Sequence, residues 1–268
     1  MRPRVWWAVF ALRCKNALQY RTAAWAGVCT QFAWGFMLIM LYQAFYRSNA
    51  QQSIQFSQLV SYVWLQQAFF AIVNTYARDG EIGEMVISGQ VAYELCRPQD
   101  LYFIWYARLL AQRFAAALLR FPPVVLVALL LPQPYGLLPP ASPWHLLLFL
   151  LTLALACLLI TAISMIMHTL VFKLMNLLSA MAVLSVLAEF LSGDILPVPF
   201  MPPWLRAVSY CLPFRYCADL PFRVYSGSIG LQEAALSVGV QLFWILLLGL
   251  LGHAFLSKQL KNVVVQGG

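Results

Sequence analysis

The strongest constraint on this fold is a set of apolar runs about 20 residues long, the length that an α-helix needs to cross the hydrocarbon core of a bilayer. The chain is 62% hydrophobic and 10% charged, whereas soluble proteins carry about 25% charged residues. A membrane β-barrel would instead show shorter segments of alternating polarity. The sequence therefore predicts an all-α integral membrane protein in which residues 1–268 form one transmembrane domain.

The apolar runs predict six transmembrane helices. We expect them at about residues 23–45, 56–76, 113–131, 144–167, 174–191 and 238–256. With this count, twelve Lys and Arg residues fall on the face that carries both termini and four on the other, with Arg120 unassigned. Basic residues accumulate in cytoplasmic loops, so we expect both termini in the cytoplasm, at a bacterial plasma membrane. His168 and Lys173 should mark a tight turn after the fourth span, and Pro122-Pro123 should bend or break the third.

Residues 2–21 predict an amphipathic helix that lies in the membrane interface ahead of the first span. Trp6, Trp7 and Phe10 share one arc of a helical wheel, and tryptophan favours the headgroup level. Arg13 and Lys15 interrupt the apolar stretch that a signal peptide would need. The alternative, that these residues simply begin the first span, stays open.

A polar stretch, residues 78–100, separates the second and third spans and should lie in the cytoplasm. Its acidic residues are Asp79, Glu81, Glu84, Glu94 and Asp100. Val91 and Leu95 are one helical turn apart, and Arg97-Pro98 should end that helix because proline lacks an N–H and constrains the preceding residue. Asp100 suits the start of the next helix. A short helix held between two spans, with acidic and apolar residues, fits a docking site for another protein.

Polar side chains also occur within the first two spans and beside the fifth. The amides are Gln31, Gln66, Gln67 and Asn74. They are costly against lipid, so they either bond between helices or line a wet path, and the sequence leaves both open. Glu189 and Asp194 lie at the outer end of the fifth span. They could relay protons as a pair, but a carboxylate solvated at the membrane edge, or paired with an arginine such as Arg206, is the favoured interpretation.

Residues 192–235 combine six prolines with large aromatic residues. This segment is too apolar for a free loop and too broken for a span. Short re-entrant helices in the outer leaflet would fit, since irregular backbone is tolerated at that depth only where protein covers it. Cys211 and Cys217 fall in this segment, and whether they pair stays open.

No motif for nucleotide binding or catalysis is present. The chain lacks the phosphate-binding G-x-x-x-x-G-K-[ST], the motifs G-x-S-x-G and H-E-x-x-H, and any C-x-x-C pair among its six cysteines. We therefore predict no catalytic residue, no metal site and no cofactor bound by this chain. Nucleic acid is not an expected partner, because no basic patch with interleaved aromatics stands clear of the membrane segments. His253, in the last span, is interpreted as a hydrogen-bonded packing residue.

Two groups of short motifs resemble one transporter family. The first is Ile87-Ser88-Gly89-Gln90-Val91 followed by Leu95, Arg97 and Pro98, and the second is Leu212-Pro213-Phe214 followed by Pro221, Gly227, Gln241, Trp244 and Gln266-Gly267-Gly268. Together with the predicted interfacial helix, six spans, cytoplasmic helix and broken outer helices, they resemble the membrane subunit of an ABC type-2 exporter. The resemblance is to the subfamily found as paired permeases with a separate ATPase.

This resemblance implies a permease that moves a substrate out of the cytoplasm with energy from a separate ATP-binding-cassette ATPase dimer, which would bind the ATP and Mg²⁺. A second permease, identical or related, would be a further partner. Coupling to the ATPase would fall to Glu81, Glu84, Val91, Glu94, Leu95 and Arg97, with Val91 and Leu95 as apolar anchors. The conduit or the permease interface would fall to Gln31, Gln66, Gln67 and Asn74.

Two other functional classes remain open from the sequence. One is a secondary transporter or channel driven by ions through Glu189 or His253, and the other is a membrane scaffold without transport. The aromatic, weakly charged spans suggest an amphipathic or hydrophobic cargo, but they do not identify it.

Overall fold

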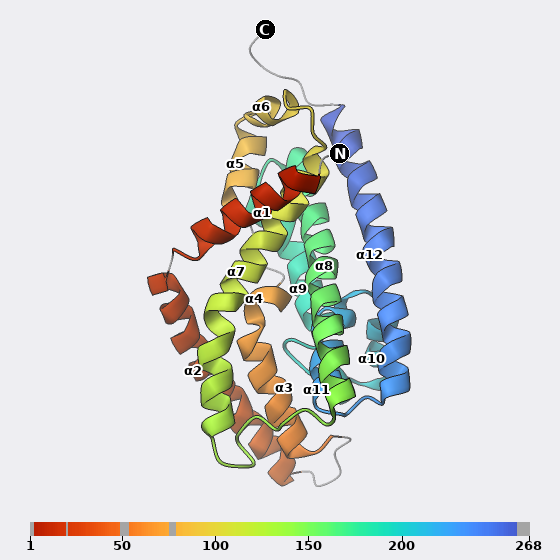
Figure 1. Cartoon of the computed structure of the whole chain (residues 1–268). Helices are drawn as coiled ribbons and strands as arrows, with labels where there is room; N and C mark the ends of the chain where they lie inside the picture. The colour runs from red at the N-terminus through yellow and green to blue at the C-terminus, as the bar shows by residue number, and fades with distance from the viewer. Residues whose placement is uncertain (1–2, 20, 49–53, 75–78, 262–268) are drawn as a thin grey trace.

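The computed structural model describes residues 3–19, 21–48, 54–74 and 79–261 (Figure 1). Every regular element in these ranges is helical, as expected. In chain order they are α1 (Pro3–Ala17), α2 (Arg21–Ser48), α3 (Phe56–Ala68), α4 (Phe70–Val73), α5 (Gly80–Ile87), α6 (Val91–Leu95), α7 (Leu101–Leu130), α8 (Pro143–Leu174), α9 (Leu177–Ser192), η1 (Val198–Phe200), α10 (Pro203–Cys211), η2 (Phe214–Tyr216), α11 (Asp219–Tyr225) and α12 (Leu231–Leu260). Arg78 and Gln266-Gly267-Gly268, used in the sequence predictions, lie outside the described residues.

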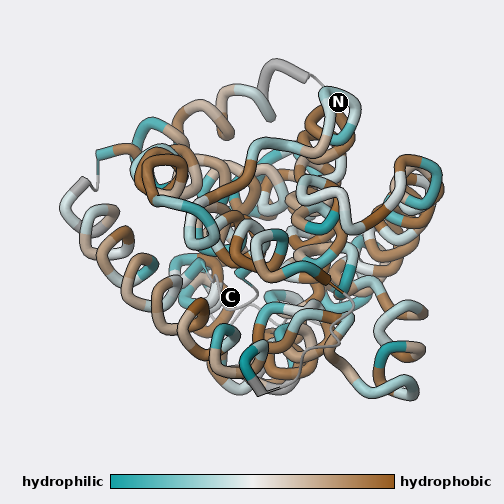
Figure 2. The backbone as a smooth tube through the Cα atoms, turned by 90° about the horizontal axis from the view of Figure 1, so that it is seen from below, coloured by the Kyte–Doolittle hydropathy of each residue, from teal (hydrophilic) through white to brown (hydrophobic). Residues whose placement is uncertain are grey.

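Four helices are long and apolar enough to cross a membrane: Ala24–Arg47 within α2, and α7, α8 and α12. α8 is central, because α7, α9, α11 and α12 all pack against it. α7 continues unbroken through Pro122 and Pro123. Leu130 of α7 and Leu250 of α12 are 77% and 71% exposed, and Figure 2 shows many hydrophobic residues, in brown, along the helices of the bundle. Helices that are apolar on every side are typical of a membrane protein.

Two of the six expected spans are shorter than predicted. The second is divided into α3 and α4, with 13 and 4 residues, and the fifth corresponds to α9, with 16 residues. From the rise of an α-helix, α3 and α9 extend about 20 and 24 Å, less than the roughly 30 Å of a hydrocarbon core. Among the described residues, four helices therefore reach spanning length.

The C-terminal end of α4 is stabilised by Arg113, a buried side chain of α7. Its guanidinium donates to the carbonyls of Ile72 at 3.0 Å and Asn74 at 2.7 Å, and to Ser164 Oγ at 2.6 Å. Carbonyls released from a helix in apolar surroundings need such a donor. No proline or glycine marks this position in the sequence, so a continuous helix was expected there.

α8 runs through the turn expected at His168 and Lys173. Both residues lie inside the helix, and the turn follows at Met175, whose φ is 50°. His168 is buried and fully partnered: the Asp79 N–H donates to its Nε2 at 3.2 Å, and its Nδ1 donates to the Ser164 carbonyl at 2.7 Å. A buried imidazole with both nitrogens bonded carries little penalty, so this polar residue does not end the helix.

α1 precedes α2 as a separate helix and packs on α7. The ring centroids of Trp6 and Phe103 are 4.8 Å apart, and those of Phe10 and Phe114 are 5.9 Å apart. Part of the predicted apolar arc therefore faces α7, while Trp7 stays exposed. The position of α1 in the membrane interface remains a prediction.

Between α9 and α12 the chain forms the short helices η1, α10, η2 and α11, as the density of prolines predicts. α9 ends at Gly193, whose φ of 86° is a left-handed conformation that suits glycine at a helix C-terminus. The Tyr62 hydroxyl donates to the Gly193 carbonyl at 2.9 Å. Cys211 is exposed and Cys217 is buried, and both thiols are free. Re-entry of this region into one leaflet stays a prediction.

Candidate functional site

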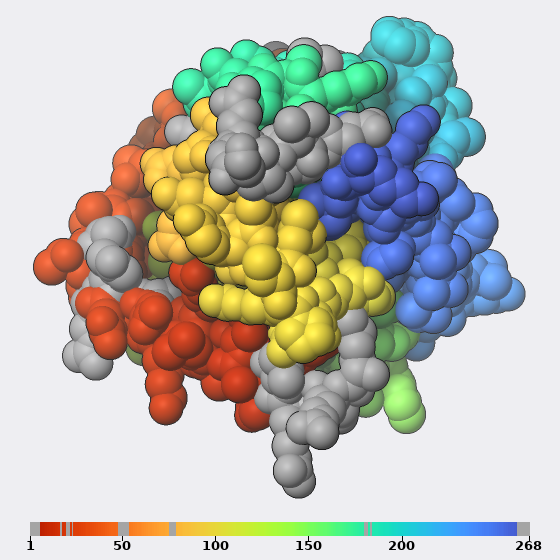
Figure 3. All heavy atoms as spheres, turned by 90° about the horizontal axis from the view of Figure 1, so that it is seen from above, coloured from red at the N-terminus to blue at the C-terminus, as the bar shows by residue number. Residues whose placement is uncertain are grey.

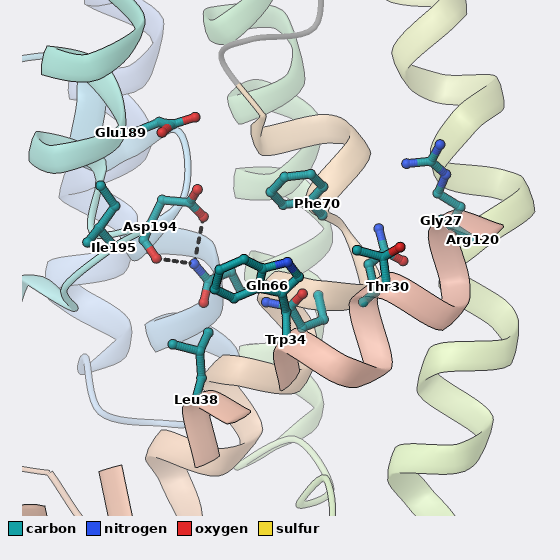
Figure 4. A pocket seen from close by; sticks show the side chains of 12 residues that line it. Gly27, Thr30, Trp34, Leu38, Gln66, Phe70, Arg120, Glu189, Asp194 and Ile195 are labelled. Atoms are coloured by element: carbon teal, nitrogen blue, oxygen red, sulfur yellow. Dashed lines mark hydrogen bonds between the residues drawn. The ribbon is translucent and has the colours of Figure 1, made fainter. Parts of the chain in front are cut away.

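A cavity of about 520 Å³ lies between α2, α3, α7 and the chain around the end of α9 (Figure 4). Three of the four amides predicted to line a path, Gln31, Gln66 and Gln67, border this cavity. Glu189 and Asp194, which the sequence analysis treated as a separate feature, border it as well. The structure therefore unites two candidate sites in one place, although they lie more than a hundred residues apart in the sequence.

The acidic side of the cavity is organised by Gln66. Its Nε2 donates to Asp194 Oδ1 at 2.6 Å and to the Asp194 main-chain carbonyl at 2.5 Å. The partner of the Asp194 carboxylate is thus an amide and not Arg206, which donates to the Met201 carbonyl instead. Asp194 lies in the loop after α9, where burial raises the pKa of its carboxyl and the bond from Gln66 opposes that shift.

The opposite side of the cavity is formed by Arg120 of α7 (Figure 4). A Cβ at Gly27 of α2 would lie 2.8 Å from Cζ of Arg120, so the guanidinium rests directly against the α2 backbone. Within the described residues, no carboxylate forms an ion pair with Arg120. The sequence did not assign Arg120 to either face of the membrane. The features that pointed to it were an arginine within an apolar helix and a glycine in another span.

Gln31 contributes a polar group that the rest of the fold does not satisfy. Its side chain is only 4% exposed, and neither its Oε1 nor its Nε2 has a hydrogen-bond partner among the described residues. Buried amides are nearly always bonded. This residue borders the cavity, but its unmatched amide oxygen and nitrogen are themselves buried.

Asn74, the fourth predicted path residue, lies apart from the other three. It borders a second cavity of about 270 Å³, together with Gln112 and Arg113. Arg120 borders both cavities. Arg120 therefore stands between the larger cavity and a smaller polar one that lies beside the interruption of α3 and α4.

α5 and α6 lie at the end of the bundle that also carries the start of α1 and the end of α12; we call it the α6 end (Figure 1). Asp79 caps the start of α5. Its buried carboxylate forms an ion pair with Arg108 of α7 and accepts from Gln112 Nε2 at 2.8 Å. Glu81 bonds to the same Arg108 and, at 3.0 Å, to Arg13 of α1. Two of the acidic residues thus connect α5 to α7 and α1.

The remaining coupling candidates divide between the interior and the surface. Val91 is 0% exposed and packs in an internal cluster around Ile82, so it is not available as an anchor for a partner. Leu95 is exposed, as are Ile87 and Tyr93, which the sequence analysis did not select. Figure 3 shows residues of α5 and α6, in yellow, in the middle of this face.

The remaining charged candidates on this surface are Glu84, Glu94 and Arg97. Glu84 is exposed on α5. Glu94 lies 3.6 Å from Arg97 in an ion pair within the loop. α6 ends at Leu95, just before Arg97 and Pro98, and Asp100 caps α7 by accepting from the Tyr102 N–H at 2.9 Å. The predicted end of one helix and start of the next are both confirmed.

His253 of α12 is hydrogen-bonded, as the sequence analysis predicted. Its Nε2 lies 2.8 Å from Asp100 Oδ2, and its ring contacts those of Tyr102 and Phe103. It does not border the larger cavity. Among the described residues, no group of three or more His, Cys, Asp and Glu side chains is arranged to hold a metal ion.

Comparison with known proteins agrees with this architecture. No curated protein matched the chain. The family described as "ABC-2 family transporter protein" matches residues 27–267, which include the larger cavity, the α5–α6 surface, most of α2 and the whole of α7, α8 and α12. The chain therefore belongs to the ABC-2 family of transporter membrane proteins.

Proposed function

We propose that this chain is the permease subunit of an ABC exporter and moves a substrate out of the cytoplasm with energy from a separate ATPase subunit. The family consists of membrane permeases without an ATPase domain of their own, so energy has to enter through a contact. The observation that carries the proposal is the network that joins Asp79 and Glu81 of the α5 region to Arg108 and Arg13. A force on α5 and α6 would act on α7 and α1 through these ion pairs.

The proposal includes six membrane crossings, two of which use the shorter segments α3–α4 and α9. The start of α1 and the end of α12 share one end of the bundle (Figure 1), which agrees with an even number of crossings. We place that end in the cytoplasm, at a bacterial plasma membrane, and residues 192–235 as a re-entrant segment on the outer side.

The complex would contain an ATP-binding-cassette ATPase dimer, which binds ATP and Mg²⁺, and a second permease, identical or related. The exposed side chains Ile87, Tyr93 and Leu95 would supply apolar contacts to the ATPase, and the charges around them would tune association. Gln31, Gln66 and Gln67 would line the substrate path.

Co-purification with an ATP-binding-cassette subunit encoded beside this chain tests the proposal. We expect the wild-type permease in nanodiscs to retain that subunit and to couple ATP hydrolysis to transport. Glu84→Lys combined with Glu94→Lys should weaken assembly with the ATPase or uncouple ATP hydrolysis from transport. Tyr93→Ala should have the same effect because it removes an apolar contact to the ATPase. Glu233→Lys, a charge reversal at an exposed acidic residue in the first turn of α12, is the matched control. Unchanged assembly and unchanged transport in the double variant would contradict the role of α5 and α6.

The same preparation separates the rival classes. An ion-coupled transporter that uses Glu189 would move substrate in proteoliposomes under a pH gradient with no ATPase present, and Glu189→Gln would stop it. A scaffold would show no flux under either condition. The exporter requires the ATPase and ATP, and it should lose transport when the ATPase carries a hydrolysis-deficient substitution.

A further inference from the structure

The larger cavity holds opposite charges on opposite walls. Glu189 and Asp194 come from α9 and the loop after it, and Arg120 comes from α7, with Phe70 and Gln66 between them in Figure 4. No carboxylate of the described residues pairs with Arg120. Charged groups within membrane-spanning helices are costly without a counter-charge, and such residues mark substrate paths for that reason. A ligand that presents both signs of charge would match both walls.

Arg120 can occupy its position because Gly27 has no side chain. The backbone of Gly27 lies so close that a Cβ would approach Cζ of Arg120 to 2.8 Å and its Nε to 3.0 Å. Contacts under about 3 Å force a shift, and the end of a flexible arginine can shift. Gly27 therefore lets the guanidinium lie against α2 at the edge of the cavity, and a methyl group there would displace the charge without removing it.

Gln31 supplies a third recognition element. Its amide is buried, has an unmatched donor and an unmatched acceptor within the described part of the chain, and borders the cavity. Leaving such a group without a partner costs about 1–3 kcal/mol. If the Gln31 side chain turned toward the cavity, a ligand with a carboxylate or an amide beside its charged group would satisfy it.

The remaining lining is apolar. Trp34, Leu38, Phe70 and Ile195 border the same space as the charged groups. A cavity of about 520 Å³ falls within the usual range for small-molecule sites, roughly 300–1,000 Å³. It can therefore enclose the head and part of the apolar body of an amphiphile.

We infer that this cavity binds a zwitterionic amphiphile, with the cationic group toward Glu189 and Asp194, the anionic group at Arg120, and the apolar body against Trp34 and Phe70. The inference deepens the proposed function by naming the chemical class of its cargo, and it rests on that function for the transport step. Binding itself involves only residues of this chain and can be measured without the ATPase.

Three probes with the same dodecyl chain test the inference: N-dodecyl-N,N-dimethylglycine, which is zwitterionic, dodecyltrimethylammonium and dodecyl sulfate. Equilibrium binding of each radiolabelled probe is measured on the purified chain in nanodiscs, below its critical micelle concentration, with empty nanodiscs as the background. We expect the zwitterion to bind tightest. Arg120→Gln should weaken zwitterion binding about tenfold or more, which corresponds to a loss of about 1.4 kcal/mol, and leave dodecyltrimethylammonium binding unchanged.

Matched variants keep the result interpretable if Arg120→Gln fails to fold. Arg120→Lys keeps the charge and should retain most of the affinity, whereas Gly27→Ala keeps the arginine and should weaken zwitterion binding by displacing it. Asp194→Asn combined with Glu189→Gln should weaken binding of the zwitterion and the cation alike. Arg206→Gln, a loss of one positive charge at an exposed residue that does not border the cavity, should change nothing.

Equal binding of the three probes to the wild-type chain would overturn the inference, as would zwitterion binding that is insensitive to both Arg120→Gln and Gly27→Ala. If the ATPase assembles and couples but the probes are not distinguished, the cargo class is wrong and the proposed function stands. If the probes are distinguished but no ATPase assembles, the binding site stands and the proposed function fails.

Discussion

The side-chain amide of Gln66 bonds twice to Asp194, to Oδ1 at 2.6 Å and to the main-chain carbonyl at 2.5 Å. One helical turn away on α3, Tyr62 donates to the carbonyl of Gly193. α3 and α9 are each too short to span a membrane alone, and these bonds fasten one to the end of the other. The acidic side of the cavity is therefore held in place by α3 as well as by the loop that contains Asp194.

Gln66→Leu should destabilise the protein. The substitution leaves two acceptors of Asp194 without their donor, and each unmet buried group costs about 1–3 kcal/mol. We expect a lower thermal unfolding midpoint in detergent, measured by intrinsic fluorescence. Gln67→Leu removes the neighbouring amide of the same cavity and leaves the Gln66–Asp194 pair intact, so it should lower the midpoint less. Equal effects of the two substitutions would show that this pair does not hold the two helices together.

Arg108→Leu should be among the most damaging substitutions at the α6 end. It would leave the buried Asp79 carboxylate without its cation, and removing one partner of a buried pair costs about 3–5 kcal/mol. Arg97→Leu is the matched control, because Arg97 is 67% exposed in its pair with Glu94, and surface pairs contribute at most about 1 kcal/mol. Chemical denaturation in mixed micelles would compare the two, and similar losses would exclude a structural role for the Asp79–Arg108 pair.

Cysteine labelling in intact cells should report the orientation of the chain. The native cysteines are first replaced, and single cysteines are then introduced near Gly268 and in the loop 132–142. A membrane-impermeant maleimide should modify only the loop, because the basic residues favour cytoplasmic termini. Modification near Gly268 from outside would reverse the proposed direction of transport.

Binding of a cation in the larger cavity should depend on pH through Asp194. Burial raises the pKa of this carboxyl above its ordinary value of 3.8, so the charged form appears at a higher pH than in an exposed aspartate. We therefore expect the affinity for dodecyltrimethylammonium to rise as the pH rises from 3.8 through that raised pKa. Asp194→Asn should make the affinity less dependent on pH in this window.

Other groups near Asp194 define the controls for this experiment. Glu189 is a second carboxylate that borders the same cavity, so Glu189→Gln is measured in parallel to isolate the effect of Asp194. Arg120 lies on the opposite side of the cavity and is unchanged in both variants. A pH dependence that persists unchanged in Asp194→Asn would assign the titration to another group.

Much of the secondary structure followed from local signals. Asp100 caps α7 and Pro98 follows the end of α6, because capping and the missing proline N–H act within a few residues. The end of α4 at Val73 did not follow, since Arg113, which bonds the carbonyls of Ile72 and Asn74, comes from a helix about forty residues further along the chain. His168 was misplaced for the same reason, because its partner Asp79 is distant in sequence.

The sequence by itself determined the class of the protein: the apolar runs are long enough for hydrocarbon, and short motifs in order indicate the transporter family. Only the tertiary structure decided which polar residues act together. It placed Val91 inside and Tyr93 outside, although both lie on one short helix, because packing against Ile82 selects one face. It also joined Gln31, Arg120 and Asp194 around one cavity, since the pairing of distant helices depends on side-chain packing that no local pattern encodes.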